Sequence, residues 1–461
     1  MTPFPRPRAL AATRLRPGHG PQTLVLLLAA LAFLLLSLPA RAVDIREVTS
    51  PGGLKAWLVE EPSIPFTALE IRFRGGTSLD APDRRGAVNL MTALLEEGAG
   101  ERDARAYAAR AEELAAEFRF RADEDAISVS ARFLTENREA SVDLLRDALV
   151  APRFDADAVE RVRGQVLSGI RSDAKDPDAI AGQAFDRLAF GSDPYATSGD
   201  GTEASVAALT ADDLRAAKAA AMARDRIYIA AVGDISEAEL GALLDRLLRE
   251  LPAAGAPIPA ATAYAAPGGV EVVPFATPQS VILFGQPGIA RDDPDFFAAY
   301  VLNEALGGGR FSARLMRELR EKRGLTYGAY SYIANMDRAD YIAGRLATAN
   351  PRVGEATAII RAEWEKAARE GLGAEELAAV KTYLTGAYPL RFDGNGPIAR
   401  ILVGMQMMGY GPDYIATRNA RIEAVTAEDV KRVAARLLAP ERLQFVVVGE
   451  PGGLETPAAA N

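Results

Sequence analysis

Two apolar runs decide how this chain is organised: Arg226-Ile227-Tyr228-Ile229-Ala230-Ala231-Val232-Gly233-Asp234 and Arg442-Leu443-Gln444-Phe445-Val446-Val447-Val448-Gly449-Glu450, which begin 216 positions apart. The same offset relates two helix-cap segments, Leu209-Thr210-Ala211-Asp212-Asp213-Leu214 and Val425-Thr426-Ala427-Glu428-Asp429-Val430, and two glycine pairs, Gly52-Gly53 and Gly268-Gly269. Self-similarity at one fixed spacing indicates a duplicated structural unit, so the sequence predicts two copies of one domain of about 200 residues.

The spacing of apolar residues predicts both helices and strands within a copy. Tyr107, Ala111, Leu114 and Phe118 recur at helical spacing, whereas the apolar residues of 127–133 alternate with polar ones, as in a strand with one wet face. Each copy then ends with a helix cap, a helix and an apolar strand, at 227–232 and at 443–448. We therefore expect an α+β fold of two tandem homologous domains, each a mainly antiparallel sheet with helices packed on one face.

Composition sets the expected domain boundaries. Residues 1–42 are predicted to be a signal peptide, 43–250 the first domain, 251–267 a linker and 268–461 the second domain. The linker is rich in alanine and proline and shows no apolar period, which is typical of a connecting segment.

The signal peptide is predicted from three features in order. A start with four arginines precedes an apolar stretch from Leu24 to Leu38, and Ala40-Arg41-Ala42 supplies a small-x-small cleavage pattern. The alternative is an uncleaved membrane anchor, although the stretch is shorter than the ~20 residues that span a bilayer. We expect cleavage after Ala42, a periplasmic location and no stable membrane anchor in the mature protein.

The composition excludes several classes of function. The chain has no cysteine and one histidine, His19, which lies in the signal peptide. The mature protein therefore lacks the residues of Ser-His-Asp and Cys-His catalysis, of zinc sites built on His or Cys, and of disulfides. The net charge is −9, and removal of the five arginines of residues 1–42 makes it −14. A chain this acidic is not expected to bind nucleic acid.

The most distinctive segment runs from a glycine cluster to a tyrosine: Gly307-Gly308-Gly309-Arg310-Phe311-Ser312-Ala313-Arg314-Leu315-Met316-Arg317-Glu318-Leu319-Arg320-Glu321-Lys322-Arg323-Gly324-Leu325-Thr326-Tyr327. Phe311, Leu315 and Leu319 predict one apolar helical stripe, and Gly324 is placed to end the helix. Beyond it, Leu325, Tyr327 and Ala329 alternate as in a strand. Arg320 and Tyr327 would then converge and donate hydrogen bonds to a peptide carbonyl. The alternative is a solvated charge run followed by a half-buried tyrosine.

This segment resembles the insulinase or pitrilysin-type zinc metallopeptidases, in particular the short two-domain bacterial members related to mitochondrial processing peptidase. The resemblance extends over nearly all of 44–451 and includes Gly371-Leu372-Gly373-Ala374-Glu375-Glu376-Leu377 and Tyr383-Leu384-Thr385-Gly386. It implies that Arg320 and Tyr327 are the family's substrate-binding pair.

The resemblance also implies that the zinc site is degenerate. Catalytic members carry His-x-x-Glu-His on a first-domain helix, in which two histidines bind zinc and the glutamate activates water. In the matching stretch 86–98, Asn89 and Ala93 replace the histidines and Thr92 replaces the glutamate. Gly169 occupies the position of the distal zinc-binding glutamate. The chain is thus predicted to hold no metal and no cofactor. Its acidic clusters, such as Asp123-Glu124-Asp125, are expected to be solvated surface.

The leading functional prediction is a noncatalytic, substrate-binding subunit of a periplasmic heterodimeric zinc metallopeptidase that acts on peptides or unfolded segments. The chain alone would not be an enzyme. Its partner would be a paralogous subunit that bears His-x-x-Glu-His and holds the zinc, while Arg320 and Tyr327 hold the peptide. The alternatives are a structural or peptide-binding protein with no proteolytic partner, and a catalytically silent homodimer.

Overall fold

The computed structural model describes residues 44–454. The predicted signal peptide, residues 1–42, lies outside this range. Within the range, no helix combines the length and the apolar character needed to cross a membrane.

The first half of the chain builds a six-stranded sheet with strand order β1-β2-β8-β3-β7-β6. Only β2 and β8 pair in parallel; the other neighbours are antiparallel. Its strands are β1 (Arg46–Thr49), β2 (Lys55–Glu60), β3 (Phe66–Arg74), β6 (Glu117–Ala122), β7 (Ala126–Leu134) and β8 (Ile227–Gly233), with a small separate pair, β4 (Gly98–Ala99) and β5 (Arg102–Asp103). Its helices are α2 (Ala87–Ala93), α3 (Ala104–Glu113), α4 (Arg138–Val150), α5 (Ala156–Asp173), α6 (Pro177–Phe190), α7 (Glu203–Ala208), α8 (Ala211–Ala221) and α9 (Glu237–Leu248).

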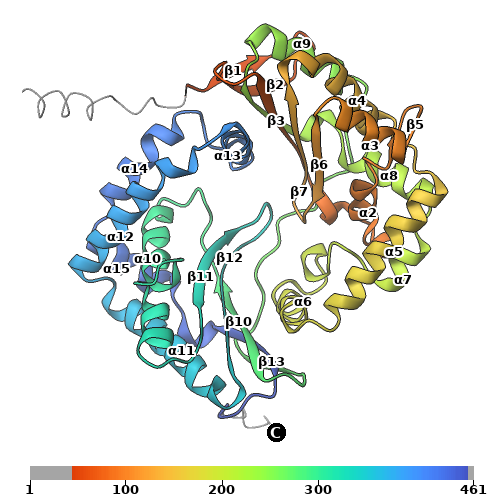
Figure 1. The fold of residues 1–461 in the computed structure, drawn as a ribbon. Helices are drawn as coiled ribbons and strands as arrows, with labels where there is room; N and C mark the ends of the chain where they lie inside the picture. The colour runs from red at the N-terminus through yellow and green to blue at the C-terminus, as the bar shows by residue number, and fades with distance from the viewer. Residues whose placement is uncertain (1–43, 455–461) are drawn as a thin grey trace, which may run out of the picture. The chain divides into compact units, whose positions relative to one another are not determined.

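The second half builds a five-stranded sheet with strand order β11-β12-β10-β13-β9. The strands are β9 (Gly269–Pro274), β10 (Gln279–Pro287), β11 (Ala329–Asn335), β12 (Asp340–Ala349) and β13 (Gln444–Gly449). The helices are α10 (Phe296–Gly307), α11 (Val353–Glu370), α12 (Ala374–Ala387), α13 (Asn395–Met407), α14 (Tyr414–Ala424) and α15 (Ala427–Leu437), with a short π-helical segment at Met316–Glu321 (Figure 1).

Five of the six strands in the first sheet have the same order as the five strands of the second sheet, which confirms the fold predicted from the repeat. The order β2-β8-β3-β7-β6 matches β9-β13-β10-β12-β11, and β8 and β13 are the two apolar runs that begin 216 residues apart. Both preceding helices start with a capping box, in which Thr210 pairs with Asp213 and Thr426 pairs with Asp429. The duplicated sequence therefore encodes a duplicated α+β domain.

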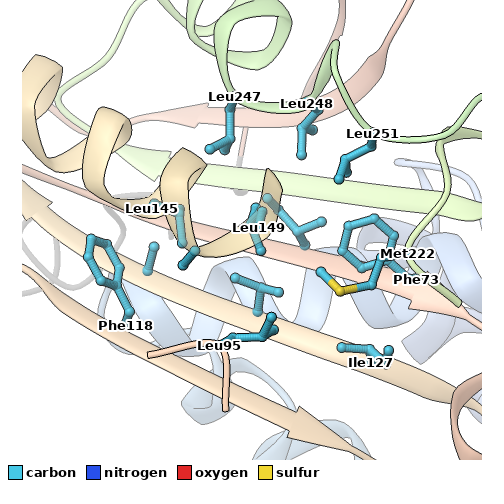
Figure 2. Close-up of a cluster of buried hydrophobic side chains, with 14 of the residues drawn as sticks. Phe73, Leu95, Phe118, Ile127, Leu145, Leu149, Met222, Leu247, Leu248 and Leu251 are labelled. Atoms are coloured by element: carbon cyan, nitrogen blue, oxygen red, sulfur yellow. The ribbon is translucent and has the colours of Figure 1, made fainter. Parts of the chain in front are cut away.

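Each half has its own apolar core between its sheet and the helices on one face. Figure 2 shows part of the first core, where Phe73 of β3 and Ile127 of β7 face Leu145 and Leu149 of α4. In the second core, Phe284 and Phe445 pack with Trp364, whose Nε1 donates a hydrogen bond to Gln286 Oε1 at 3.0 Å. Each sheet therefore has helices packed on one face, as the sequence predicted.

The prediction of one helical stretch from Tyr107 to Phe118 was wrong. The helical spacing that runs from Tyr107 to Phe118 does not belong to a single helix, because α3 ends at Glu113 and Phe118 lies in β6. Ala115 has a φ of 49°, in the left-handed region, which turns the chain out of the helix before the strand. The buried side of a short helix followed by a strand imitates the spacing of one longer helix.

Each sheet is covered on its other face by a helix from the opposite half. Helix α6 of the first half contacts β10 and β13, and its Phe185 and Phe190 are buried there. Helix α13 of the second half contacts β3 and β8 and buries Leu402 and Val403. This reciprocal exchange lies beyond the sequence prediction, and it joins the two halves by apolar packing on both sides.

The segment 251–267 forms no helix or strand but is bound to its surroundings. Tyr264 is buried, Thr262 N donates to Arg338 O at 2.8 Å, and Ala265 N donates to Ala189 O at 2.8 Å. The residues at 253 and 254 are exposed. Residues 257, 260, 261, 263, 265 and 267 are exposed as well, so a protease has access along the segment.

Brief proteolysis is expected to cut within 251–267 without separating the two halves. The exchanged helices α6 and α13 would hold the fragments together, because each is buried on the other half's sheet. Native size-exclusion chromatography of the nicked protein should give one peak that contains both fragments, and denaturing electrophoresis should resolve them. Separate elution of two folded fragments under native conditions would contradict this exchange.

Candidate substrate-binding segment and degenerate zinc site

The helix that carries Arg320 differs from the predicted one. The segment Met316–Glu321 is a π-helix, with Lys322 N donating to Arg317 O at 3.0 Å, five residues back. Leu315 and Leu319 are fully buried, whereas Phe311 precedes the helix and is 62% exposed. The predicted stripe of three residues was therefore wrong at Phe311. Short π-helical segments occur frequently at functional sites.

A turn after this helix presents Tyr327 to solvent. Gly324 has a φ of 60°, and its N–H donates to Arg320 O at 2.9 Å, so it ends the helix as predicted. The Thr326 hydroxyl donates to Gly328 O at 2.8 Å and accepts from Gly328 N at 3.1 Å, which bends the chain outward. Tyr327 is 84% exposed. The expected strand alternation from Leu325 was wrong, since β11 begins at Ala329.

The Arg320 guanidinium stacks on an aromatic ring and does not pair with the neighbouring carboxylate of Glu318. Its guanidinium carbon lies 4.7 Å from the centroid of the Phe311 ring. Glu318 instead pairs with Lys322 at 2.7 Å and Arg323 at 2.8 Å. Burial would raise the pKa of Glu318, but the hydrogen bonds from these two cations lower it to about 2. Arg320 thus keeps its hydrogen-bond donors available.

The structure places Arg320 and Tyr327 on either side of the Gly324 turn. Over residues 44–454 no hydrogen bond joins their side chains, and neither side chain forms an ion pair. Both therefore retain free hydrogen-bond donors. The glycine-rich segment before them contributes a further aromatic contact, because Arg310 lies 5.0 Å from the ring centroid of Tyr383 on α12.

The positions that the family resemblance assigns to a degenerate zinc site lie on α2 and α5, two helices in contact. Asn89 Nδ2 donates to Asp200 Oδ1 at 2.7 Å. Thr92 is buried, and its hydroxyl has no hydrogen-bond partner among the described residues, whereas Ala93 and Gly169 are exposed. A Cβ at Gly169 would meet no atom within 4 Å, so steric crowding does not explain the missing glutamate.

A buried aspartate fixes the start of α2. Asp80 accepts hydrogen bonds from Gly86 N and Val88 N, both at 2.9 Å. Burial raises the pKa of Asp80 to about 6, partly offset by these hydrogen bonds. Asp80 therefore fixes the first turn of the helix that carries Asn89, Thr92 and Ala93.

Carboxylates surround Asn89 in a cavity of about 340 Å³. Its lining includes Asp123, Glu124, Asp173, Asp186 and Asp200. The acidic cluster Asp123-Glu124-Asp125, which was expected to be solvated surface, is only partly solvated. Asp123 is exposed. Asp125 accepts hydrogen bonds from the Tyr195 hydroxyl and from Asp337 N, the latter at 2.9 Å. Burial raises the pKa of Asp125 to about 6. The sequence gives no signal for this cavity, because its residues are remote from one another along the chain.

Asp186 makes stability depend on pH. Burial, and then the negative charge of Glu124, raise its folded-state pKa from 3.8 to about 7. The folded state therefore binds the proton more tightly than the unfolded state, and stability falls as pH rises from about 4 to 7. Asp186→Asn should melt at a higher temperature than wild type at pH 8, and the difference should shrink toward pH 5. An unchanged difference across this range would contradict the assignment.

Metal content is expected to reflect the lost ligands. Among residues 44–454, no group of three or more His, Cys, Asp and Glu side chains is arranged to hold a metal ion. The purified mature chain should therefore retain no stoichiometric zinc after dialysis and should cleave no fluorogenic peptide, with a His-x-x-Glu-His homologue treated in parallel as control. One tightly held zinc per chain with chelator-sensitive cleavage would refute this.

The fold is thus a duplicated α+β domain, and its second copy carries Arg320 and Tyr327 on either side of a turn. Residues 55–198 match the family model described as insulinase (peptidase family M16), and residues 208–384 match the one described as peptidase M16 inactive domain. The chain belongs to the insulinase family, peptidase family M16.

Similar proteins carry both peptidase and non-peptidase names. An uncharacterized zinc protease of Streptomyces coelicolor is 28% identical over 417 residues, or 88% of this chain and 89% of that protein. The non-peptidase homolog YmxG of Helicobacter pylori is 26% identical over 340 residues, or 72% and 77%. The crystal structure of a peptidase M16 inactive domain from Pseudomonas fluorescens has a TM-score of 0.83 at 29% identity, covering 90% of this chain and 100% of that one.

Proposed function

We propose that this chain is the noncatalytic, substrate-binding subunit of a heterodimeric zinc metallopeptidase of the periplasm, and that it acts on peptides or unfolded segments. The observation that carries the proposal is the contrast between the two halves. The first half lacks every zinc ligand and the general base of the family, whereas the second half presents Tyr327 at 84% exposure. The phenol hydroxyl of Tyr327 is therefore accessible to a ligand.

The chemistry of Arg320 and Tyr327 fits a peptide backbone. The Arg320 guanidinium and the Tyr327 hydroxyl are hydrogen-bond donors, and a peptide carbonyl accepts hydrogen bonds. Phe311 holds the guanidinium by stacking, so less side-chain freedom is lost when it binds. The other cations of the helix neutralise Glu318 and leave Arg320 for a ligand.

Two sheet edges support an extended peptide as the ligand. Strand β6 ends the first sheet and β11 ends the second, and each has a neighbouring strand on one side only. An edge strand offers unpaired N–H and C=O groups to which an extended segment can add. Strand β11 directly follows the turn that carries Tyr327.

A zinc-bearing partner would supply the missing reaction chemistry. Zinc polarises the scissile carbonyl and activates water, which this chain cannot do with the residues at 89, 92, 93 and 169. This chain would position the peptide and donate hydrogen bonds to the developing oxyanion.

Co-purification tests the proposal. The tagged full chain is purified from the periplasm of its source, and bound proteins are identified by mass spectrometry. We expect a partner of similar fold with an intact His-x-x-Glu-His motif, and peptide cleavage by the reconstituted pair but by neither chain alone. Purification of the chain alone, or with copies of itself only, would favour the structural or homodimeric alternatives, as would a partner without zinc ligands.

A further inference from the structure

A second cavity lies on the face of the first sheet that is opposite to its core. Strands β3, β6 and β7 form its floor and the start of α13 forms a wall. Helix α13 contacts β3 and β8, whereas α3, α4 and α9 pack on the core side (Figure 1). The volume is about 580 Å³, within the ~300–1,000 Å³ range of small-ligand sites. The cavity therefore lies between the covering helix and the edge strand β6, and it shares only Ala122 and Asp123 with the cavity beside Asn89.

Positive charge predominates in this cavity, although the chain as a whole is acidic. The charged residues of its lining are Arg72, Arg119, Arg121, Arg132, Arg400, Glu70, Glu117 and Asp123. Each of the three carboxylates has a partner within the protein. Glu117 pairs with Arg132 at 2.5 Å, and Asp123 Oδ1 accepts two backbone N–H bonds at 2.8 and 2.9 Å. Glu70 is buried, and its carboxylate lies 3.5 Å from Arg400 Nη1.

The other three arginines form no ion pair within residues 44–454. Arg119 and Arg121 are exposed, at alternate positions of β6. Arg72 is partly buried, and its Nη1 donates to the uncharged thioether of Met407 at 3.7 Å. Burial raises the pKa of Glu70, and the charge of Arg72 offsets this only in part, from beyond ion-pair distance. A partly buried cation without a paired carboxylate is costly, and a bound anion would offset that cost.

The strand register places two of these arginines on either side of a free hydroxyl. Ser128 of β7 is the direct neighbour of Arg72 on β3 and of Arg121 on β6, and all three line the cavity. Neighbouring strands are ~4.8 Å apart, so the two arginines start from backbone positions about 10 Å apart. Over 44–454 the Ser128 hydroxyl forms no hydrogen bond, whereas the Ser130 hydroxyl donates to Glu70 at 2.7 Å. This Arg-Ser-Arg row therefore offers free donors from three adjacent strands.

We propose that the Arg-Ser-Arg row binds a side-chain carboxylate, that of an aspartate or a glutamate, in the peptide that the chain holds. The proposal rests on the function proposed above and adds a preference for acidic segments. A carboxylate has two oxygens with about four acceptor sites, which suits two guanidinium groups and one hydroxyl around it. The edge strand β6 borders the cavity and offers backbone pairing to an extended peptide. The terminal carboxylate of a peptide has the same chemistry, so the test separates the two.

Matched peptide pools test the proposal on the full mature chain. Each pool of unstructured peptides carries a neutral fluorophore and an amidated C-terminus, with either glutamate or glutamine at one fixed position. Anisotropy should show about tenfold or tighter binding of the glutamate pool, as expected for charge-assisted hydrogen bonds. The mature chain has a net charge of −14, so its overall field would favour the glutamine pool instead. A third pool, with glutamine and a free terminal carboxylate, should bind like the amidated glutamine pool.

Three variants locate the effect. Arg72→Gln with Arg121→Gln should reduce the preference for glutamate to less than about threefold. Arg121→Gln alone changes an exposed side chain, so folding should be unaffected, and it should weaken the preference by about threefold or more. Arg105→Gln with Arg249→Gln removes the same charge as the first variant from exposed positions on α3 and at the end of α9, and should retain the preference. Melting curves verify folding of all three.

The outcomes that would overturn the carboxylate site differ from those that would overturn the proposed function. Equal binding of the two amidated pools would refute the carboxylate site and leave peptide binding intact. A preference that persists in the Arg72/Arg121 variant, or that disappears in the Arg105/Arg249 variant, would also refute this site. Tightest binding of the pool with a free terminus would overturn the assignment to a side chain. Absence of binding by every pool would refute the carboxylate site together with the proposed peptide binding.

Discussion

Replacement of Tyr327 by phenylalanine is expected to lower the turnover number of the reconstituted peptidase pair by about a hundred- to a thousand-fold. Loss of one pre-positioned donor to a developing oxyanion typically has this effect, ~2.7–4 kcal/mol. The substitution removes only the hydroxyl of a side chain that is 84% exposed, so folding and assembly should be unchanged. Steady-state kinetics on a complex with verified zinc content measure the change.

Two further variants separate the role of Tyr327 from that of a surface tyrosine. Tyr330→Phe alters another exposed tyrosine, on β11, whose hydroxyl accepts from Arg345 Nη1 at 3.4 Å, and should leave turnover near wild type. Arg320→Ala should raise KM as well as lower kcat, because the guanidinium can also bind the peptide before reaction. Wild-type kinetics for Tyr327→Phe and Arg320→Ala in an assembled, zinc-loaded complex would assign both residues a structural role.

Replacement of Arg338 by methionine is expected to lower the free energy of unfolding by about 3–5 kcal/mol, because a largely buried ion pair would lose one partner. Arg338 lies in the turn between β11 and β12, and its guanidinium donates to both oxygens of Asp193, at 2.6 and 2.8 Å. The side chains are 4% and 16% exposed. Burial would raise the pKa of Asp193, but the hydrogen bond from Arg338 brings it below its usual value. Urea unfolding measures the loss.

A second arginine on the same hairpin is the matched control. Arg345 of β12 pairs with Asp178 of α6, but these side chains are 38% and 46% exposed, so Arg345→Met should change stability by at most ~1 kcal/mol. Adding Asp193→Asn to Arg338→Met should recover part of the loss, because the unpaired charge is then removed. Equal effects of the two arginine substitutions would contradict the role assigned to burial.

The sequence was sufficient for the features that depend on neighbours along the chain or on direct comparison of its two halves. The offset of 216 predicted two equivalent sheets, and the capping residues Thr210 and Thr426 predicted where two helices begin. The loss of the zinc ligands also follows from composition, since a chain without histidine in 43–461 cannot carry the motif in any alignment. Strand alternation failed only near Tyr327, where the Thr326 turn replaces the expected strand.

Tertiary structure decided the features that join distant parts of the chain. The exchange of α6 and α13 depends on which apolar face meets which sheet, and the apolar spacing of a helix does not specify whether it covers its own half or the other. Glu124 and Asp186 share one cavity although 62 residues separate them. Local spacing specifies which face of a helix or strand is apolar, whereas burial and the distance between charges arise only when those faces pack. The sequence therefore identified the duplicated domain, and packing alone created the acidic cavity beside Asn89.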